Sequence, residues 1–526
     1  MQTSFFYDAT VGTLAILAPE LVLILSAIAM MTLSPFVRLS RRQWCRISVW
    51  AILASSAALF WAWGRQTDVY ASAAINDALA LWSQLLILGS GLLVLGLAHE
   101  EPSDERAAEF FGSLLLMNAG AMLVASANDV VFLFVGLELV SIPTYLVLYL
   151  TRRTPTTQEA ATKYFYLSIL ASGLLLYGLA FLYGSTGISN LKAMAYLSSR
   201  PVNMPNVHLA LIAIVFVMAG LCFRVAAVPL HFYAPDVYQG SPTIIAAVLS
   251  WLPKAVGFLA MIRVITAIFS QASTELTEQA TVLAWIIAAA TMILGNFVAL
   301  LQENLKRLLA YSSIAHAGYL MVGVTAALAL GSHGATLYHG VEGIFFYLVA
   351  YSLMTLGAFG VIIMLRIDGR PVETVRQLSG LGWTKAWPVG LAMAVCLLSL
   401  SGIPPLLGFW GKFEVFASAL SALNFDDSSS LLVLTILGVL NSAIGAYYYL
   451  RIVVLMYLAP SEGEMEVRGG WPVASSVGAC AVLTVFLGLF WGLVAAPARQ
   501  AAHAAAYLPE PAKIVAEELE TASTRP

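Results

Sequence analysis

The sequence predicts an all-α polytopic membrane protein with about fourteen transmembrane helices. Of its 526 residues, 60% are hydrophobic and only 10% are charged, whereas about a quarter of the residues in soluble domains are charged. Apolar runs of about 20 residues, enough to cross about 30 Å of hydrocarbon, recur along the whole chain. The ten-residue alternation of apolar and polar residues that marks an outer-membrane barrel is absent. We therefore expect a helical bundle with no soluble domain.

Polar loops divide these runs in chain order. The segment before the first run, MQTSFFYDATVG, has no basic residue, so we expect a retained helix rather than a cleaved signal. After about residue 498 the chain is polar and Ala-rich, which predicts a short surface helix and a disordered end. The predicted spans are 12–33, 46–64, 78–98, 110–127, 129–150, 162–184, 208–232, 243–268, 279–301, 306–330, 343–366, 387–420, 431–458 and 472–496.

Basic residues in short loops predict the orientation, because they gather on the cytoplasmic side of a membrane. One side has Arg65, Lys192, Arg200 and little else. The other side is therefore cytoplasmic, and both termini face outward. The cytoplasmic set is Arg38, Arg41, Arg42 and Arg46, then Arg152, Arg153 and Lys163, then Lys306 and Arg307, and finally Arg366, Arg370, Arg376 and Lys385.

The seventh and twelfth spans contain helix breakers. Pro229 lies within FRVAAVPLHFYAPD, and Gly402, Pro404 and Pro405 lie within SLSGIPPLLGFWGKF. Broken spans five apart favour two inverted five-helix repeats. We therefore divide the chain into residues 1–109 (helices 1–3), 110–268 (first repeat, helices 4–8), 279–458 (second repeat, helices 9–13) and 459–526 (helix 14 and a polar tail).

Four charged residues lie inside apolar runs, where a charge costs several kcal/mol and indicates a functional path. Glu138 can hold and release a proton, or simply hydrogen-bond a neighbouring helix. Lys254 lies near the middle of its span, which disfavours the alternative of snorkelling to the membrane surface. Lys412 follows the Gly-Pro break and either exchanges a proton or caps a half-helix. Arg224 keeps its proton at any ordinary pH, so it tunes its neighbours or forms a permanent ion pair with Glu138.

Two further observations complete the candidate site. His316 is a mid-span histidine, suited to a proton relay because an unperturbed imidazole has a pKa of about 6.5, although a satisfied core histidine is an equal alternative. Glu414 either pairs with Lys412 or faces outward. The four cysteines are far apart and form no CxxC motif, so we expect apolar fillers rather than iron–sulfur ligands. No Gly-rich nucleotide loop follows a strand.

Several segments together make the chain resemble antiporter-like subunit N of bacterial NADH–quinone oxidoreductase (respiratory complex I), which is related to mitochondrial subunit 2. They occur in the family's order and extend over most of the chain. The segments are GLELVSIPTYLV (136–147), EAATKYFYLSILASGLLLYGLAFLYG (159–184), VPLHFYAPDVYQGSPT (228–243), NLKRLLAYSSIAHAGYLMVG (304–323), GIPPLLGFWGKF (402–413) and YYYLRIVVLMY (447–457).

The resemblance implies a fourteen-helix fold in which two half-channels join through a central polar axis. It assigns the family's fifth-span glutamate to Glu138, the eighth-span lysine to Lys254, the tenth-span histidine to His316 and the twelfth-span lysine to Lys412. Arg224 stands where the family has a lysine, which makes its role electrostatic.

The implied function is proton translocation coupled to electron transfer from NADH to quinone. The expected partners are the other membrane-arm subunits and the lipid bilayer, without nucleic acid. We expect no cofactor or metal in this chain, since NADH, flavin, iron–sulfur clusters and quinone belong to partner subunits. Two alternatives stay open. One is a subunit of a cation/proton antiporter or membrane-bound hydrogenase, and the other is a scaffold that conducts no protons.

Overall fold

The computed structural model describes residues 12–65, 68–151, 154–198, 207–269, 274–330, 337–422, 429–461 and 463–509. Most of these residues are helical. The long helices are α2 (Ala18–Leu33), α3 (Arg41–Ala62), α4 (Ala78–Leu97), α5 (Ala107–Ser126), α6 (Val130–Thr151), α7 (Pro155–Thr186), α9 (Val207–Val225), α11 (Thr243–Phe269), α12 (Thr274–Leu300), α13 (Leu305–Leu330), α14 (Leu337–Met364), α15 (Trp387–Ser401), α16 (Leu407–Ala422), α17 (Ser430–Leu458), α18 (Gly470–Leu489) and α19 (Gly492–Ala506). Two shorter helices are α8 (Leu191–Ser198) and α10 (Ala234–Gly240).

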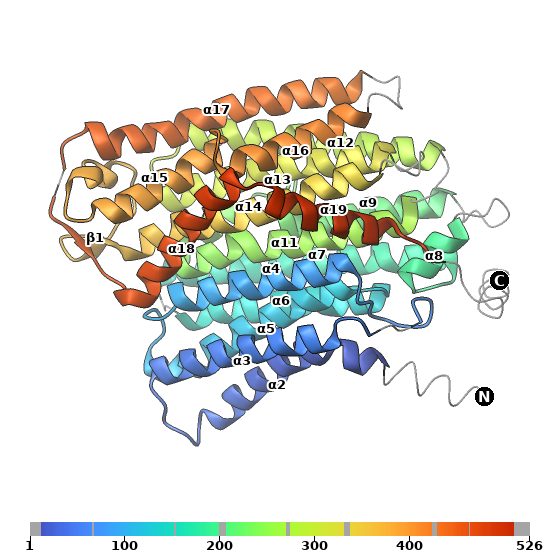
Figure 1. The fold of residues 1–526 in the computed structure, drawn as a ribbon, viewed down its shortest axis with the longest axis horizontal. Coiled ribbons are helices and arrows are strands. Elements are labelled where there is room, and N and C mark those ends of the chain that lie inside the picture. The colour runs from blue at the N-terminus through green and yellow to red at the C-terminus, as the bar shows by residue number, and fades with distance from the viewer. Residues whose placement is uncertain are drawn as a thin grey trace.

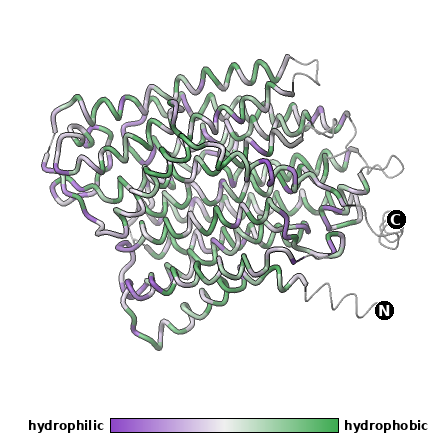
Figure 2. Tube along the Cα trace, viewed as in Figure 1, coloured by the Kyte–Doolittle hydropathy of each residue, from purple (hydrophilic) through white to green (hydrophobic). Residues whose placement is uncertain are grey.

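These helices form one bundle, which confirms the predicted polytopic all-α class. Twelve helices among the described residues are long and apolar enough to cross a membrane. The two other predicted spans are shorter elements. The first is α2, with 16 residues, and the twelfth is divided between α15, with 15 residues, and α16, with 16. Figure 2 shows hydrophobic residues along the helices and hydrophilic residues mainly near the two ends of the bundle.

The centre of the bundle is formed by α11 and α13. In each of these helices the most apolar 18-residue stretch is 100% buried, whereas only 33% of the corresponding stretch is buried in α7 and in α17. Figure 1 shows the chain filling the bundle from α2 at one edge to α17 at the other. The last two helices then return across the middle. α18 and α19 pack on α14 and α4. Charged residues on α11 and α13 are therefore surrounded by protein rather than lipid.

Both predicted helix breaks are present. In the seventh span α9 ends at Val225 and α10 begins at Ala234, with Ala226 at a positive φ of 57°. In the twelfth span α15 ends at Ser401 and α16 begins at Leu407, with Gly402 at φ 87°. A residue in this left-handed conformation commonly ends a helix, and glycine adopts it without steric cost. The division into two inverted repeats stays a prediction.

Three features differ from the sequence-based expectations. The fourteenth helix ends at Leu489 instead of continuing to 496, and α19 begins at Gly492. This helix begins earlier than the expected surface helix, and one of its faces buries Val494, Ala498 and Ala502 against the bundle. A small antiparallel sheet also joins β1 (Leu365–Ile367) to β2 (Arg370–Pro371) and β3 (Met465–Val467). The sequences of these short connecting segments do not predict that they pair as strands.

Some predictions fall outside the described residues. Both termini were expected to lie outside the cell, and residues 1–11 and 510–526 are not described. Arg152, Arg153 and Arg200 are also outside the described ranges. The nearest described segments of the two ends meet the same end of the bundle. The Thr13 hydroxyl lies 2.9 Å from the Ser72 hydroxyl, and the backbone oxygen of Tyr507 accepts from Lys192.

Candidate functional site

Glu138 and Arg224 form an ion pair between α6 and α9. Arg224 Nη2 donates to Glu138 Oε1 at 2.6 Å, and Arg224 Nη1 donates to the Leu137 carbonyl at 3.1 Å. Ser172 of α7 adds a third partner, since its hydroxyl donates to Glu138 Oε1 at 2.6 Å. The Arg224 side chain is 4% exposed and that of Glu138 is 24% exposed. Glu138 is therefore the more exposed member of the ion pair.

Arg224 lies against the turn of α11 that follows Lys254. A Cβ atom added at Gly257 would lie 3.3 Å from the Cβ of Arg224 and 2.5 Å from a methyl group of Val225. Only glycine allows so close an approach of α9 to α11. This close approach holds the ion pair of Glu138 and Arg224 beside α11, the helix that carries Lys254.

Lys254 is 1% exposed, which rules out snorkelling to the membrane surface. Its Nζ donates to the backbone oxygen of Ser313 in α13. The Ser313 hydroxyl accepts at 2.9 Å from Tyr351 of α14, and Lys254 Nζ lies 6.0 Å from the centre of the Tyr351 ring. No carboxylate of the described residues is within ion-pair distance of Lys254. Such a lysine can be neutral or charged without breaking a salt bridge.

His316 is buried on α13, one turn after Ser312 and Ser313. Its Nδ1 meets the hydroxyl of Tyr347, and its Nε2 lies 3.0 Å from the hydroxyl of Tyr449 in α17. The Tyr449 hydroxyl also meets the Ser312 hydroxyl. Both ring nitrogens therefore have partners that can donate or accept a proton. Both ring nitrogens of His316 thus have hydrogen-bond partners, as expected for a core histidine that has only a structural role. The same hydroxyl partners are those that a proton relay needs.

Lys412 lies at the break between α15 and α16. Its Nζ donates to the backbone oxygens of Leu400 and Ser401, each at 3.0 Å, and to the Ser442 hydroxyl at 2.9 Å. The two carbonyl oxygens belong to the end of α15, where intrahelical donors are missing. Lys412 thus does cap a half-helix. Because both contacts weaken when the amine is neutral, this cap also responds to the protonation of Lys412.

A polar chain continues from Lys412 towards His316. Lys412 Nζ lies 5.1 Å from the centre of the Tyr319 ring. Asn296 of α12 donates to the Tyr319 hydroxyl at 3.1 Å and accepts from the Tyr448 hydroxyl at 3.2 Å. Tyr448 precedes Tyr449, the partner of His316. The five predicted residues therefore lie on α6, α9, α11, α13 and α16, and hydroxyl and amide groups occupy the spaces between the last three.

Sequence reasoning did not find several members of this polar axis. The tyrosines and Asn296 are missed because such residues are common in membrane helices and carry no formal charge. Three charges within or directly beside apolar runs were also passed over, although the rule that selected Lys254 applies to them. These are Glu20, which accepts at 2.7 Å from Gln84, Arg263, and Glu342, which accepts at 2.8 Å from Arg499.

The placement of Glu414 settles whether it pairs with Lys412. The two side chains leave α16 on different sides, and the charged neighbours of Glu414 are Glu342 and Arg499. Arg499 comes from α19, so this acidic pair lies beneath the returning end of the chain. Glu414 therefore does not complete the Lys412 site.

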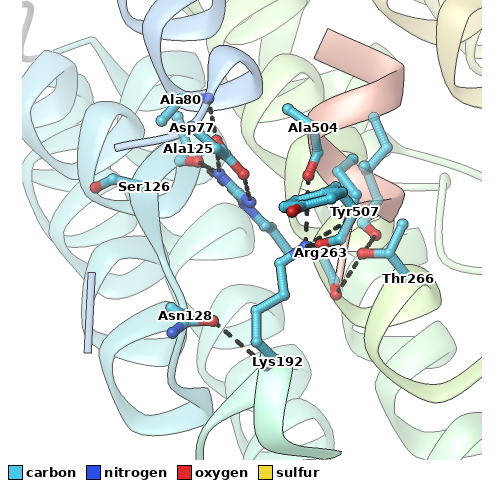
Figure 3. Close-up of polar contacts among 12 residues, drawn as sticks. Asp77, Ala80, Ala125, Ser126, Asn128, Lys192, Arg263, Thr266, Ala504 and Tyr507 are labelled. Carbon is cyan, nitrogen blue, oxygen red and sulfur yellow. Dashed lines mark hydrogen bonds and ion pairs between the residues drawn. The ribbon is translucent and has the colours of Figure 1, made fainter. Parts of the chain in front are cut away.

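A second polar cluster lies near the C-terminal end of α11, close to Lys192 (Figure 3). Arg263 binds both oxygens of Asp77, at 2.6 and 2.8 Å. Asp77 also caps α4 by accepting from Ala80 N at 2.8 Å. Burial alone would raise the pKa of the Asp77 carboxyl, but the Arg263 guanidinium outweighs burial and holds the pKa below its ordinary value of 3.8.

Lys192 closes the same cluster against the end of α19 (Figure 3). Its Nζ donates to the backbone oxygens of Ala504, Ala505 and Tyr507, at 3.4, 2.8 and 2.7 Å. Burial lowers the pKa of Lys192 to about 8, although the neighbouring Asp77 carboxylate opposes this shift. Lys192 was predicted as an ordinary loop cation. In the structure it is a buried anchor for the last helix.

The cysteines fit their predicted role as apolar fillers. Cys45, Cys222, Cys396 and Cys480 are all free and buried, each within a helix. Within the described ranges no three His, Cys, Asp or Glu side chains form a group that could hold a metal ion.

Comparisons with known proteins place this site in a family. The family described as NADH:quinone oxidoreductase/Mrp antiporter, TM, matches residues 127–445. A NADH-quinone oxidoreductase subunit N from Trichlorobacter lovleyi is 37% identical over 457 residues, which are 86% of this chain and 89% of the relative. The subunit N from Paramagnetospirillum magneticum is 36% identical over 502 residues, covering 94% and 97%.

Solved structures agree with these matches. A chain of respiratory complex I from Thermus thermophilus with bound aureothin has a TM-score of 0.73 at 32% identity, covering 91% of this chain and 98% of that one. A chain of the membrane-bound sulfane sulfur reductase, an archaeal respiratory membrane complex, has a TM-score of 0.78 at 21% identity, covering 97% and 99%. The second likeness shows a shared fold.

The matched segment 127–445 contains all five residues of the axis, from Glu138 to Lys412. The match covers more than half of the chain, and the relatives align over nearly their full length. The chain therefore belongs to the NADH:quinone oxidoreductase/Mrp antiporter membrane family and, within it, to the subunit N proteins of NADH–quinone oxidoreductase.

Proposed function

We propose that this chain is a proton-translocating membrane-arm subunit of an NADH–quinone oxidoreductase, and that Glu138, Arg224, Lys254, His316 and Lys412 form its proton path. The observation that carries the proposal is the buried polar axis itself. Charged or ionisable groups on five helices follow one another through the centre of the bundle. In a membrane such groups are too costly to keep without a function.

The chemistry of the proposed path is a transfer of protons between basic groups, driven by changes in nearby charge. Two unit charges 4 Å apart at an effective dielectric of about 20 interact by about 4 kcal/mol. Moving Glu138 away from Arg224 would leave the guanidinium charge uncompensated beside α11, and this charge would oppose protonation of Lys254. Lys254 and Lys412 bind carbonyl oxygens rather than carboxylates, so each can gain or lose a proton without an ion pair opposing the change.

Arg224 has a different role in the proposal. A guanidinium keeps its proton under all ordinary conditions, so Arg224 sets the local field and does not carry a proton. His316 and its tyrosine partners would link the two lysines. The redox chemistry of the complex is assigned to other subunits, which would hold NADH, flavin, iron–sulfur clusters and quinone.

The proposed orientation puts the Arg307 end of α13 in the cytoplasm and the Lys192 end of the bundle outside. The excess of basic loop residues at the first end supports it. Both termini then face outward from a bacterial inner membrane, because Thr13 and Tyr507 make their contacts at the Lys192 end.

Proton pumping by the purified complex in vesicles tests the proposal. Lys412→Ala and Glu138→Gln should lower the number of protons moved per electron several-fold, while the complex still assembles and oxidises NADH. Exposed residues provide the controls, and Lys385→Ala and Glu303→Gln should pump normally. Wild-type stoichiometry in both Lys412→Ala and Glu138→Gln would refute the proposed path.

A further inference from the structure

The joint between α18 and α19 lies directly on the break between α15 and α16. α18 packs on both α15 and α16. A Cβ atom added at Gly488 of α18 would lie 2.4 Å from the backbone oxygen of Pro405 and 2.7 Å from the backbone nitrogen of Leu407. The backbone of α18 therefore touches the backbone of the break, with no side chain between them.

Trp491 makes a second contact at this joint. It stands between Leu489, the last residue of α18, and Gly492, the first residue of α19. Its ring stacks on the ring of Trp410 in the first turn of α16, with the ring centres 4.9 Å apart and the planes at 18°. Trp410 Nε1 has no hydrogen-bond partner among the described residues, so packing against neighbouring rings holds this side chain in place.

The residues around Trp410 fix the start of α16 against two other helices. Gly408 N donates to the Ser399 hydroxyl of α15 at 3.0 Å. A Cβ atom added at Gly411 would lie 2.8 Å from Cδ2 of Tyr347, the α14 tyrosine that meets the histidine of the polar axis. A shift of this turn would therefore disturb both the end of α15 and the partner of that histidine.

Lys412 follows directly on the same turn. Its Nζ reaches the last carbonyl oxygens of α15, each at 3.0 Å, across the break. Pro404 and Pro405 have no N–H group to donate, so the hydrogen bonds of a helix do not continue through the break. The position of the Lys412 amine therefore depends on what packs against this segment from outside.

We propose that Trp491 and Gly488 are positioning residues for Lys412. The joint of α18 and α19 packs on the break, keeps α16 against α15 and thereby holds the Lys412 amine on its carbonyl acceptors. Neither residue carries a proton. This inference rests on the proposed function, because the role it gives to the joint is to keep one residue of the proton path in place.

Removing the stacked ring tests the role of Trp491. In Trp491→Ala we expect the number of protons moved per electron to fall several-fold, because a small displacement of a transferring group slows the transfer steeply. Trp491→Phe keeps an aromatic face over Trp410 and should restore most of the pumping. Trp471→Ala is the control, since Trp471 is 79% exposed near the start of α18, and it should pump normally. Wild-type pumping in Trp491→Ala would overturn the role of this ring.

Two glycines of α18 test the backbone contact. Gly488→Ala drives a methyl group into the Pro405 carbonyl, whereas nothing lies within 4 Å of the Cβ atom added in Gly478→Ala. Both substitutions replace glycine by alanine in the same helix, so they change helix propensity alike. Gly488→Ala should lower pumping per assembled complex and Gly478→Ala should not. Equal pumping in the two variants would contradict the positioning role of Gly488.

A double variant distinguishes positioning of Lys412 from a general structural defect. Trp491→Ala added to Lys412→Ala should reduce pumping no further, because no amine remains to be misplaced. Independent effects would instead combine, each variant contributing its own loss. A further several-fold loss in the double variant would show that Trp491 does not act through Lys412.

The outcomes also separate this inference from the proposed function. Wild-type pumping in Trp491→Ala and Gly488→Ala, together with a defect in Lys412→Ala, would refute the role of the joint and leave the proposed path intact. Wild-type pumping in Lys412→Ala and Glu138→Gln would remove the path and the positioning role together. If Trp491→Ala fails to assemble, the comparison of Gly488→Ala with Gly478→Ala decides.

Discussion

Arg224 Nη2 and Glu138 Oε1 lie 2.6 Å apart, and the same guanidinium also binds the Leu137 carbonyl. The ion pair is therefore fixed by contacts that a single nitrogen cannot reproduce. This geometry explains how arginine can serve where relatives of this family are expected to have lysine. It supplies a permanent charge and holds Glu138 in one place.

We predict that Arg224→Lys keeps the charge and supports pumping close to the wild-type rate. Arg224→Met leaves Glu138 without its partner, and breaking a buried pair costs about 3–5 kcal/mol. This second variant should lose both pumping and stability. Proton movement per electron and assembly of the complex measure the two effects. Faster pumping in Arg224→Lys than in the wild type would show that the site gains from a group able to exchange its proton.

Gly402 makes possible the approach of Lys412 to the end of α15. It adopts φ 87°, and a Cβ atom there would lie 3.1 Å from Lys412 Cδ and 3.3 Å from Nζ. We predict that Gly402→Ala lowers the free energy of unfolding by about 1–2 kcal/mol and also lowers pumping by shifting the amine. Gly89→Ala is the control, because nothing lies within 4 Å of its added Cβ. A thermal melt followed by a thiol-reactive dye checks this, since the buried cysteines react only on unfolding.

The ion pair between Asp77 and Arg263 predicts acid sensitivity. The pKa of Asp77 lies below its ordinary value of 3.8, so the unfolded chain binds more protons than the folded chain at acid pH. The stabilisation is present above pH 3.8 and is lost as the pH falls through the lower, folded value. The melting temperature of the wild type should therefore drop below about pH 4. Asp77→Asn, measured over the same pH range, should lack this part of the drop and be less stable at neutral pH.

Lys192 predicts a second rise of stability with pH, at the alkaline end. Its pKa in the folded chain is about 8, below the ordinary 10.5, so the free energy of unfolding of the wild type should rise between these two values. Lys192→Met removes that rise. The variant also leaves carbonyl oxygens of α19 unbonded, which costs about 1–3 kcal/mol for a buried group. Proteolysis of the C-terminal segment measures the loosening of α19, and resistance equal to the wild type would contradict the anchoring role.

Much of the fold was predictable, because membrane helices must be long and apolar. The breaks at Pro229 and Gly402 were predictable for the same reason, since each residue conflicts with a continuous helix. The packing of α19 against the bundle was not predictable. The Ala-rich segment that forms α19 is too polar to resemble a span, and its burial depends on contacts with α4 and α14 that local sequence does not encode.

The candidate site was predictable only where a residue is unusual for its surroundings. Glu138, Lys254 and Lys412 stand out as charges in apolar runs. The hydroxyls that connect them do not, because the chain contains 21 tyrosines and most of these are ordinary in a membrane helix. Tyr347, Tyr351 and Tyr449 became identifiable only when α14 and α17 were placed against His316 and Ser313.

The anchoring of α19 also has a consequence for the order of synthesis. Lys192 finds its carbonyl partner at Ala505, 313 positions later in the chain. At about 5–20 residues per second, these partners leave the ribosome roughly 15–60 s after Lys192 does. During that interval the first half of the bundle is present but the ammonium of Lys192 has none of its three carbonyl acceptors. This contact with α19 can thus form only after Ala504, Ala505 and Tyr507 have been made, so in a chain truncated before residue 504 Lys192 should lack all three acceptors.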